Sequence, residues 1–376
     1  MGVTETDASI VRTVVDRPAL LLVALAGLYF LADLLAKLAG VAYAPSGVQV
    51  FGGNVAVSQV ATFIVDGLIL GLIIGLAGVG LSMTYSILNF ANFAHGDYMT
   101  TGAFSGWVAA YIVAGFGVTA PLANVLLLNQ PALVSVVSTP LAVVVGLVVS
   151  AGFTVATVLA IDRFVYKPMR DKGGISLLIA SIGVALALRY LIVFIFQTNT
   201  RGLTAAGSIP QIQVYIVDGT LNLDLHEITL AVAAIVLMLS VHFMLQRTKL
   251  GKAMRAMADN KDLAQVTGIP TERVIRATWA IGGGLAGVSG FLIVLEKGTL
   301  SFNLGWLLLL LIFAGVILGG IGSVYGAIGG GLIIGVVSRL SLVWIPSDFA
   351  RAAAFLIMII VLLYRPEGLF GGVKTA

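Results

Sequence analysis

The chain consists of long apolar runs separated by short polar segments, and this pattern predicts its elements. Runs of about 20 apolar residues are long enough to cross a bilayer as a helix. Hydropathy places predicted spans near residues 18–40, 60–89, 98–118, 138–161, 174–196, 226–246, 276–295, 304–321, 324–343 and 349–364. The sequence therefore predicts an all-α, polytopic integral membrane protein with about 10 transmembrane helices.

The composition agrees with this class and excludes others. Hydrophobic residues make up 59% of the 376 residues and charged residues only 10%, whereas a soluble domain covers its surface with charge. The net charge of +4 is too weak to predict nucleic-acid binding. The chain has no cysteine, and its three histidines lack metal-ligand spacing. We therefore expect no metal site, no cofactor and no thiol chemistry.

The first apolar run, residues 18–40, resembles a secretory signal peptide. Its small-residue cleavage site, residues 24–26, lies in the middle of the run, and Asp33 and Lys37 follow. We therefore interpret this run as an uncleaved first span.

Basic residues are distributed unevenly between the polar segments. With a cytoplasmic N-terminus, the outer segments hold only Arg201 and Lys297. The other Lys and Arg residues of the polar segments lie on the inner side. The inner segments are residues 1–17, 90–97, 162–173, 247–275 and the C-terminal tail. Because cytoplasmic loops of membrane proteins are enriched in Lys and Arg, we expect both termini to be cytoplasmic.

Glycines recur four residues apart in several predicted spans. Such pairs form grooves in which another helix backbone can lie close, so we expect them to be helix-packing sites. The pairs are Gly71/Gly75, Gly283/Gly287, Gly315/Gly319, Gly322/Gly326, Gly326/Gly330 and Gly331/Gly335. The glycine-rich stretch Leu318–Ala327 predicts a tight inner turn, because glycine permits positive φ.

Polar side chains gather at the inner end of the second span, at Asn89, Asn92, His95 and Asp97. Unsatisfied polar groups in hydrocarbon cost several kcal/mol each, so the cluster must pair internally or line a wet cavity. One interpretation is a broken segment that borders the substrate path, with His95 as a group that titrates near neutral pH. The other is a capped interfacial turn. The sequence leaves both open.

Asp66, Arg189 and Arg339 are three further charges at membrane depth. Charged groups inside a span usually face the bundle interior or a cavity. Arg189 lies deeper than Arg339, and we expect it to form an internal ion pair. Asp66 is expected to cap the outer end of its span, and Arg339 to extend to the outer interface.

The longest hydrophilic stretch, residues 247–276, holds seven of the 21 Lys and Arg residues. Its middle, Leu250–Ala264, has helix-forming composition, and Gly268–Pro270 predicts the end of that helix. A second helix is predicted to begin at Thr271. We expect a short helix lying along the membrane surface where a soluble partner can bind.

The chain carries no visible means of hydrolysing ATP. Gly251-Lys252 is not a Walker A motif, because Gln246 occupies the position that requires glycine. No nucleophile–base set, paired carboxylate cleft or metal cluster is present. The chain is therefore predicted not to be an enzyme, and any ATPase would be another polypeptide.

Six motifs lie in order between about residue 60 and residue 371. They are Asn89–Tyr98 (NFANFAHGDY), Ile161–Arg170, Ser176–Gly183, the elements of Gly251–Gly290, Leu318–Gly330 and Tyr364–Gly371. Together they resemble the LivH-type permeases of branched-chain amino acid ABC importers. The chain differs from that pattern in its N-terminal extension and in His-Gly-Asp at 95–97, where His-Gly-Glu is commoner.

The resemblance implies a permease subunit of an ATP-driven importer in the cytoplasmic membrane, with leucine, isoleucine or valine as cargo. It implies as partners a second, LivM-type permease, two cytoplasmic ATPase subunits, an extracytoplasmic substrate-binding protein and membrane lipid, with no nucleic acid. The loop 247–275 would carry the coupling helix that fits a groove on the ATPase. The docking positions carried over are Arg255, Ala258, Asp259, Asn260, Leu263, Ala264 and Gly268.

The expected organisation is a cytoplasmic tail (1–17), an additional transmembrane helix (18–40) and a permease domain (60–371). Two alternatives remain at this stage. One is a permease for urea or short amides, which the FAHG form disfavours. The other is a proton-coupled secondary carrier with His95 and Asp97 as the relay. A passive channel is disfavoured because no ring-forming filter motif is visible.

Overall fold

The computed structural model describes residues 18–47, 49–115, 134–204 and 209–371. The predicted N-terminal tail, residues 1–17, lies outside the described residues. The chain divides into two compact units, which are described separately. Unit 1 comprises residues 1–62 and 214–221, and unit 2 comprises residues 63–213 and 222–376.

Unit 1 begins with α2 (Pro18–Leu38), followed by β1 (Ala42–Tyr43), η1 (Pro45–Gly47), β2 (Phe51–Gly52) and the first turns of α3 (Val57–Leu88). The two charges in α2 are paired, with Lys37 Nζ lying 2.6 Å from the Asp33 carboxylate. Asp33 also accepts a hydrogen bond from the Gly52 N–H at 2.6 Å. This pairing neutralises both charges within an otherwise apolar helix.

The N-terminus of α3 is capped by a residue far away in the sequence. Asp218, in the turn between β4 (Gln211–Ile216) and β5 (Gly219–Asp224), accepts hydrogen bonds from the N–H groups of Ser58, at 2.9 Å, and of Val57. These bonds favour the carboxylate and hold the pKa of Asp218 below its usual value. The expectation that Asp66 caps this helix is wrong, because α3 begins at Val57 and Asp66 lies well inside it.

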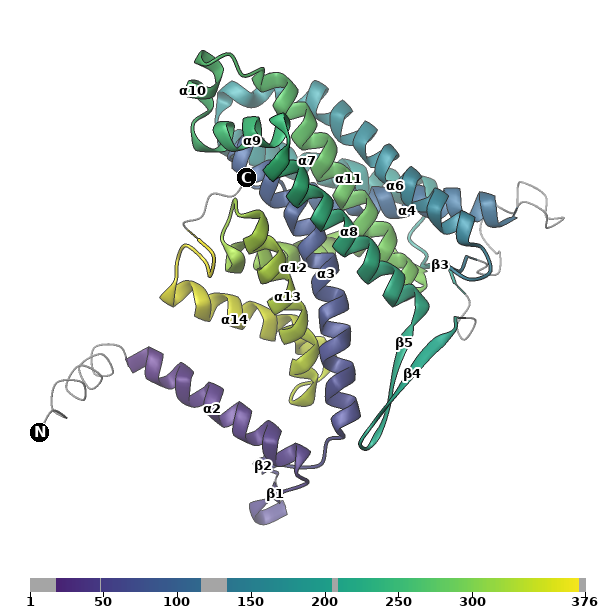
Figure 1. Ribbon diagram of the computed structural model, residues 1–376, viewed down its shortest axis with the longest axis vertical. Coiled ribbons are helices and arrows are strands. Elements are labelled where there is room, and N and C mark those ends of the chain that lie inside the picture. Colours follow the sequence, from purple (N-terminus) through teal and green to yellow (C-terminus); the bar gives the residue numbers. More distant parts are fainter. Residues whose placement is uncertain (1–17, 48, 116–133, 205–208, 372–376) are drawn as a thin grey trace, which may run out of the picture. The chain divides into compact units, whose positions relative to one another are not determined.

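Unit 2 is helical apart from short strands (Figure 1). Its helices beyond α3 are α4 (His95–Gly115), α6 (Pro140–Ile161), α7 (Gly174–Phe196), α8 (Leu225–Arg247), α9 (Lys249–Asp259), α10 (Lys261–Val266), α11 (Thr271–Lys297), α12 (Leu304–Gly319), α13 (Val324–Leu340) and α14 (Ala350–Tyr364). Short irregular helical segments are η2 (Asp162–Tyr166), η3 (Lys167–Lys172), η4 (Ser341–Val343) and η5 (Ser347–Phe349).

Every predicted span coincides with one of these helices, which confirms the helical, polytopic membrane class. Within the described residues, eight helices are long and apolar enough to cross a membrane. The two predicted spans outside this set are α4 and α12. α12 has only 16 residues, and α4 begins with His95 and Asp97 and continues through Thr100 and Thr101.

Contacts between loops hold several helix ends of unit 2 together. β3 (Arg201–Gly202) pairs antiparallel with β6 (Thr299–Leu300), so the loop after α7 meets the loop after α11. Elsewhere, the Leu369 N–H donates to the Leu318 carbonyl at 2.8 Å, which fixes the segment after α14 to the turn between α12 and α13. Gly320 and Gly322 have positive φ in that turn, as the glycine-rich stretch predicted.

Glycines bring helix backbones of unit 2 into direct contact. A Cβ placed on Gly71 of α3 would lie 2.7 Å from Leu332 Cα of α13, and one on Gly67 would lie 2.7 Å from Val336 Cα. A Cβ on Gly102 of α4 would overlap the backbone of Gly287 in α11. These contacts confirm that the predicted glycines within helices are packing sites, whereas Gly322 lies in the turn before α13 and packs against no helix backbone.

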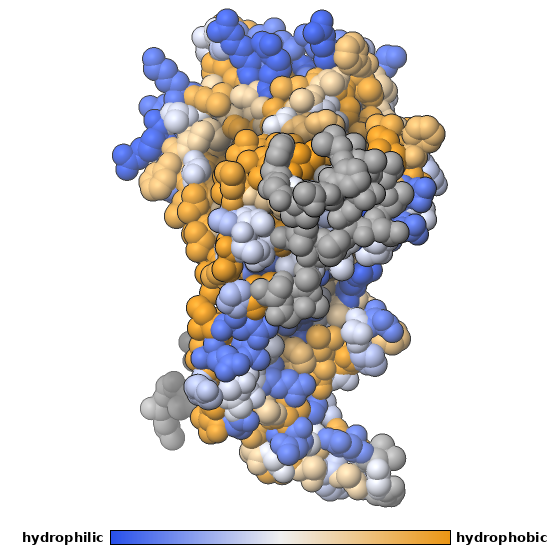
Figure 2. Space-filling model, turned by 90° about the vertical axis from the view of Figure 1, so that its right-hand side faces the viewer, coloured by the Kyte–Doolittle hydropathy of each residue, from blue (hydrophilic) through white to orange (hydrophobic). Residues whose placement is uncertain are grey.

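The surface of unit 2 separates polar from apolar residues. Figure 2 shows hydrophilic side chains gathered at the upper end, where α9 and α10 lie in Figure 1, with hydrophobic side chains directly below them. On α6 and α7, large apolar side chains point outward, with Val148 66% exposed and Phe194 85% exposed. Exposed apolar residues on spanning helices are what contact with lipid requires.

Candidate functional site

The hydrophilic segment after α8 folds into two helices, α9 and α10, where the sequence predicted one. The break falls at Asn260, whose backbone is extended (φ −157, ψ 104). Asn260 Oδ1 accepts a hydrogen bond from the Leu263 N–H at 2.9 Å and so begins α10. Thr248 caps α9 in the same way through the Gly251 N–H, at 3.0 Å. Asn is a strong N-cap residue, and here its capping interrupts a helix-forming stretch.

One face of α9 and α10 packs onto the protein itself. Met254, Met257 and Ala264 are buried in the core of unit 2. Gly251 allows α9 to lie directly against the backbone of Leu245 at the end of α8. Arg255 donates to the Leu245 carbonyl at 2.9 Å and to the Gln246 side chain at 3.2 Å. Two predicted docking residues, Arg255 and Ala264, thus contact their own chain.

The other face of this segment is exposed. Asp259, Asn260 and Gly268 lie on the surface and Ala258 is half-buried. Leu263 is 61% exposed and Val266, which the sequence did not single out, is 86% exposed. Gly268 has φ 85 and ends α10 as predicted. α10 therefore presents two aliphatic side chains to the surroundings, framed by charged and polar residues.

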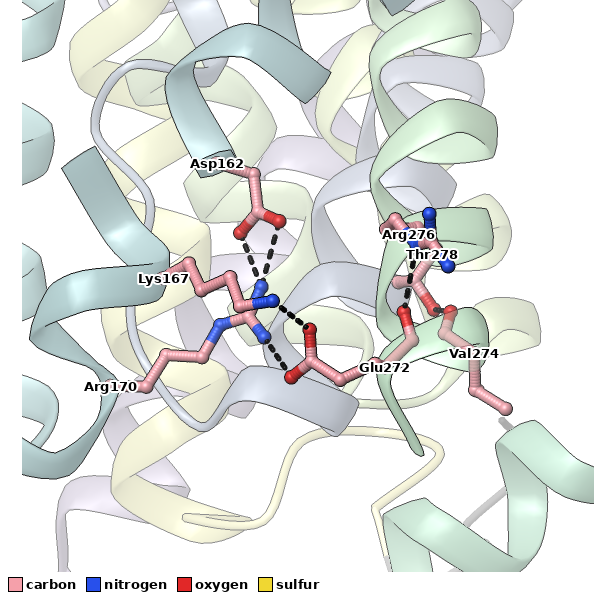
Figure 3. Close-up of polar contacts among 7 residues, drawn as sticks. All are labelled: Asp162, Lys167, Arg170, Glu272, Val274, Arg276 and Thr278. Carbon is pink, nitrogen blue, oxygen red and sulfur yellow. Dashed lines mark hydrogen bonds and ion pairs between the residues drawn. The ribbon is translucent and has the colours of Figure 1, made fainter. Parts of the chain in front are cut away.

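Four charged residues join the end of α6 to the start of α11 (Figure 3). Arg170 of η3 binds both oxygens of Asp162, at 2.6 and 2.7 Å, and also binds Glu272 of α11 at 2.7 Å. Lys167 lies 3.1 Å from the other oxygen of Glu272. We call this group, Asp162, Lys167, Arg170 and Glu272, the ion-pair junction. It connects the loop after α6 to the helix that follows α10.

The junction was not predicted as a site. Arg170 and Glu272 each belong to a stretch noted in the sequence, but they are 102 residues apart. Asp162 and Arg170 are 4% and 9% exposed, whereas Glu272 and Lys167 are about half exposed. The buried pair holds η3 in place, and the exposed pair connects η3 to α11.

The polar cluster at the start of α4 is buried and largely satisfied. Asn92 Oδ1 accepts a hydrogen bond from the Ala94 N–H at 3.1 Å, which caps α4. His95 Nε2 lies 2.9 Å from the Ala77 carbonyl oxygen in α3. Tyr166 reaches Asn92 at 3.4 Å and stacks on Trp279. Asn89 has positive φ and ends α3. The internal pairing and the capping that the sequence suggested are both present.

Asp97 and Arg189 form an ion pair inside unit 2. The two residues make two hydrogen bonds, at 3.0 and 2.8 Å. Asp97 is fully buried, the Arg189 side chain is 13% exposed, and the guanidinium lies 4.6 Å from the centre of the Trp306 ring. The predicted internal ion pair of Arg189 is confirmed, and its partner is the Asp97 of the predicted cluster.

No group of three His, Cys, Asp or Glu side chains suited to a metal ion occurs among the residues that the structure describes. The prominent charged groups described above hold helices and loops in position.

The comparisons with known proteins agree on one family. The model of the family described as "Branched-chain amino acid transport system / permease component" matches residues 63–362. The permease BraD of Pseudomonas aeruginosa is 27% identical over 311 residues, covering 82% of this chain and 94% of the relative. The LivH permease of Escherichia coli K12 is 26% identical, covering 81% and 94%.

A relative from another organism gives the same result. The probable LivH permease of Methanocaldococcus jannaschii is 30% identical over 320 residues, covering 79% of this chain and 88% of the relative. No solved structure matches the chain.

Proposed function

Because this chain belongs to the family of branched-chain amino acid transport system permease components, we propose that it carries leucine, isoleucine and valine across the cytoplasmic membrane. As such a permease component it is a transport subunit and not an enzyme. Membership in a binding-protein-dependent ABC system implies an ATPase and a binding protein as partners. The full assembly we propose adds a second, LivM-type permease, two cytoplasmic ATPase subunits and an extracytoplasmic binding protein.

The topology we propose has ten spans, including α4 and α12, with both termini cytoplasmic. The distribution of basic residues supports this orientation. The loop contacts support the grouping of loops by side, because β3 pairs with β6 and the ion-pair junction joins the loops after α6 and before α11. Each contact joins loops assigned to the same side. The proposed domains are an inner tail (1–17), an additional helix (18–40) and a permease domain (60–371).

The ATPase binds, in this proposal, to the exposed face of α9 and α10 within residues 247–275. The single observation that supports this most strongly is the pair of exposed aliphatic residues, Leu263 and Val266, on a helix at the polar end. Aliphatic side chains at the centre of a contact, framed by charges, are typical of a protein interface. Asp259 and Asn260 lie beside them and would fix the register of the two subunits.

Movement of α10 would reach the core along two routes. One is covalent, because only residues 267–270 separate α10 from α11. The other is the ion-pair junction, which connects the first turn of α11 to η3 and α6. Closure of the ATPases would then shift α11 and α6 together and change the side to which the pathway opens.

We also propose that Asn89, Asn92, His95 and Asp97 border this pathway. Charged residues inside spans mark substrate paths in many transporters. Asp97 pairs with Arg189, whose side chain is 13% exposed and lies over the Trp306 ring. The ion pair thus connects the buried cluster to a side chain that is partly accessible.

The test of the docking proposal uses the double variant Leu263→Ser/Val266→Ser in the assembled transporter. We expect co-purification of the ATPase to weaken by at least about tenfold, because apolar anchors dominate interface affinity. ATP-dependent uptake of leucine should fall in parallel. The matched control is Gln265→Ser, an exposed change between the two positions, which should leave both measurements unchanged. Undiminished ATPase binding and uptake in the double variant would contradict docking at α10.

The cargo is tested by uptake into vesicles that contain the transporter and its binding protein. Leucine, isoleucine and valine should enter when ATP is present, and collapse of the proton gradient should not stop them. Competition with urea and short amides separates the alternative cargo: inhibition by these compounds but not by valine would overturn the amino acid assignment.

A further inference from the structure

Unit 2 contains a cavity of about 420 Å³ at the helix ends next to β6. It lies among the ends of α11 and α13 and the beginnings of α12 and α14. On the proposed topology this is the extracytoplasmic side. The cavity is large enough for a small polar metabolite, because ligand pockets begin at roughly 300 Å³.

Three cations line this cavity: Lys297, Arg339 and Arg351. No acidic side chain belongs to its lining. Among the described residues, none of the three cations forms an ion pair. Three cations without an ion-pair partner at a concave site favour an anionic ligand group, because charge-assisted hydrogen bonds would stabilise it there.

Aliphatic side chains also line the cavity. Leu304, Leu308 and Leu311 line it from α12, and Leu70 lines it from α3. The three α12 leucines lie on one face of that helix because they are spaced four and three residues apart. Hydroxyl groups, such as those of Ser301 and Ser347, belong to the lining as well. The lining therefore combines apolar and cationic side chains.

Two acidic residues, Asp66 and Glu296, interact electrostatically with Arg339, but neither lines the cavity. The groups that a ligand in the cavity can contact are therefore cations, hydroxyl groups and aliphatic side chains. An inorganic anion would make no favourable contact with the aliphatic side chains.

We propose that this cavity is a binding site in the permease for the free amino acid, with the α-carboxylate on Arg339 and Arg351 and the aliphatic side chain against the leucines of α12. The site deepens the proposed function and rests on it, since it assigns the recognition of a branched-chain amino acid to residues of this chain. Arg339 is the central contact because it is the least exposed of the three cations. Arg351 and Lys297 are more exposed and attract the carboxylate as it enters.

The experiment exploits the absence of cysteine from the chain. Ser347→Cys, on an exposed residue that lines the cavity, introduces the one thiol of this subunit. In the assembled transporter in lipid nanodiscs, this thiol should react faster with an anionic than with a cationic thiosulfonate reagent, because the neighbouring cations attract the anionic reagent. L-Leucine should slow the reaction, and L-leucinamide, which lacks the carboxylate, should not.

Charge variants then identify the groups that bind leucine. In the Ser347→Cys background, Arg339→Gln and Arg351→Gln should each raise the leucine concentration needed for protection by about tenfold, the effect of losing a charge-assisted hydrogen bond. The matched control is Arg365→Gln, an exposed arginine after the other end of α14, which should change nothing. Because Arg351 is exposed, its replacement is not expected to disturb folding.

Equal protection by leucinamide, no protection by leucine, or unchanged protection in Arg351→Gln would overturn the site. Uptake of leucine with the binding protein is measured separately on the same preparation. Normal uptake without protection of the introduced thiol would reject only this site, whereas the absence of uptake of any branched-chain amino acid would reject the proposed function.

Discussion

Small residues have opposite roles at the centre of unit 2 and in the α9–α10 segment. Where α4 meets α11, glycines allow backbones to touch, and an added methyl group on Gly102 would overlap Gly287. On α9 and α10, alanines and caps shape short helices, and the outward side chains of Leu263 and Val266 touch little of the chain. The first region has no space for added atoms, whereas the second exposes side chains that a partner can contact.

This difference shows where the protein can change shape. Tightly packed backbones act as a single body, because close-packed interiors deform little. Movement is therefore expected at the joints of this body, namely the extended residue Asn260 and the half-exposed part of the ion-pair junction. The following predictions test the contrast between the two regions.

The largest effect on stability is expected for Asp97→Asn. It leaves the Arg189 guanidinium in the protein interior without its carboxylate, and breaking a buried pair costs about 3–5 kcal/mol. The measurement is thermal unfolding of the purified transporter subunit in detergent. Asp259→Asn, the same chemical change on the exposed α9–α10 segment, should leave the unfolding temperature unchanged. Equal stability of the two variants would mean that the ion pair contributes nothing to the core.

A smaller loss is expected for Gly102→Ala. The new Cβ overlaps the Gly287 backbone, so α4 and α11 must separate, at a cost of about 1–3 kcal/mol. The matched control is Gly152→Ala in α6, where an added Cβ meets nothing within 4 Å. The control should retain or slightly gain stability, because alanine favours the helix. Comparable unfolding temperatures for both variants would argue that α4 and α11 do not pack through glycine.

The smallest change in stability is expected for Glu272→Gln in the ion-pair junction. Glu272 is half exposed, and pairs of this kind contribute about 0.2–1 kcal/mol. Its effect on function should be larger than its effect on stability: uptake should fall while ATP hydrolysis continues. Asp162→Asn, which breaks the buried part of the junction, is the comparison and should destabilise more. Full coupling of hydrolysis to uptake in Glu272→Gln would show that the junction transmits no movement.

Much of the helical architecture follows from the sequence because the bilayer fixes the length of each apolar run. The glycine pairs and the end of α10 at Gly268 were also predictable, since they depend on local backbone geometry. Contacts between distant residues were not. Nothing local indicates that Asp218 caps α3, or that Arg170 meets Glu272, because each pair is more than 100 residues apart.

In the candidate site, too, local features were predictable and contacts formed in the fold were not. The sequence predicted the hydrophilic segment, and the exposed Leu263 within it. It did not predict the interruption at Asn260, because the surrounding composition favours a continuous helix. The hydrogen bond from the Leu263 N–H to the Asn260 side chain, which begins a new helix there, is seen only in the structure. Arg189 was expected to find a partner inside the protein, and the structure identifies that partner as Asp97.

The interruption at Asn260 makes α10 a separate six-residue piece, held by Ala264 on its inner side and joined to its neighbours by non-helical residues. Its outer residues can therefore diverge without disturbing the helices on either side. In a cell that contains several importers of this kind, such divergence would keep each permease matched to its own ATPase. On the docking proposed for α10, exchanging these six residues between two such permeases would exchange the ATPases they bind.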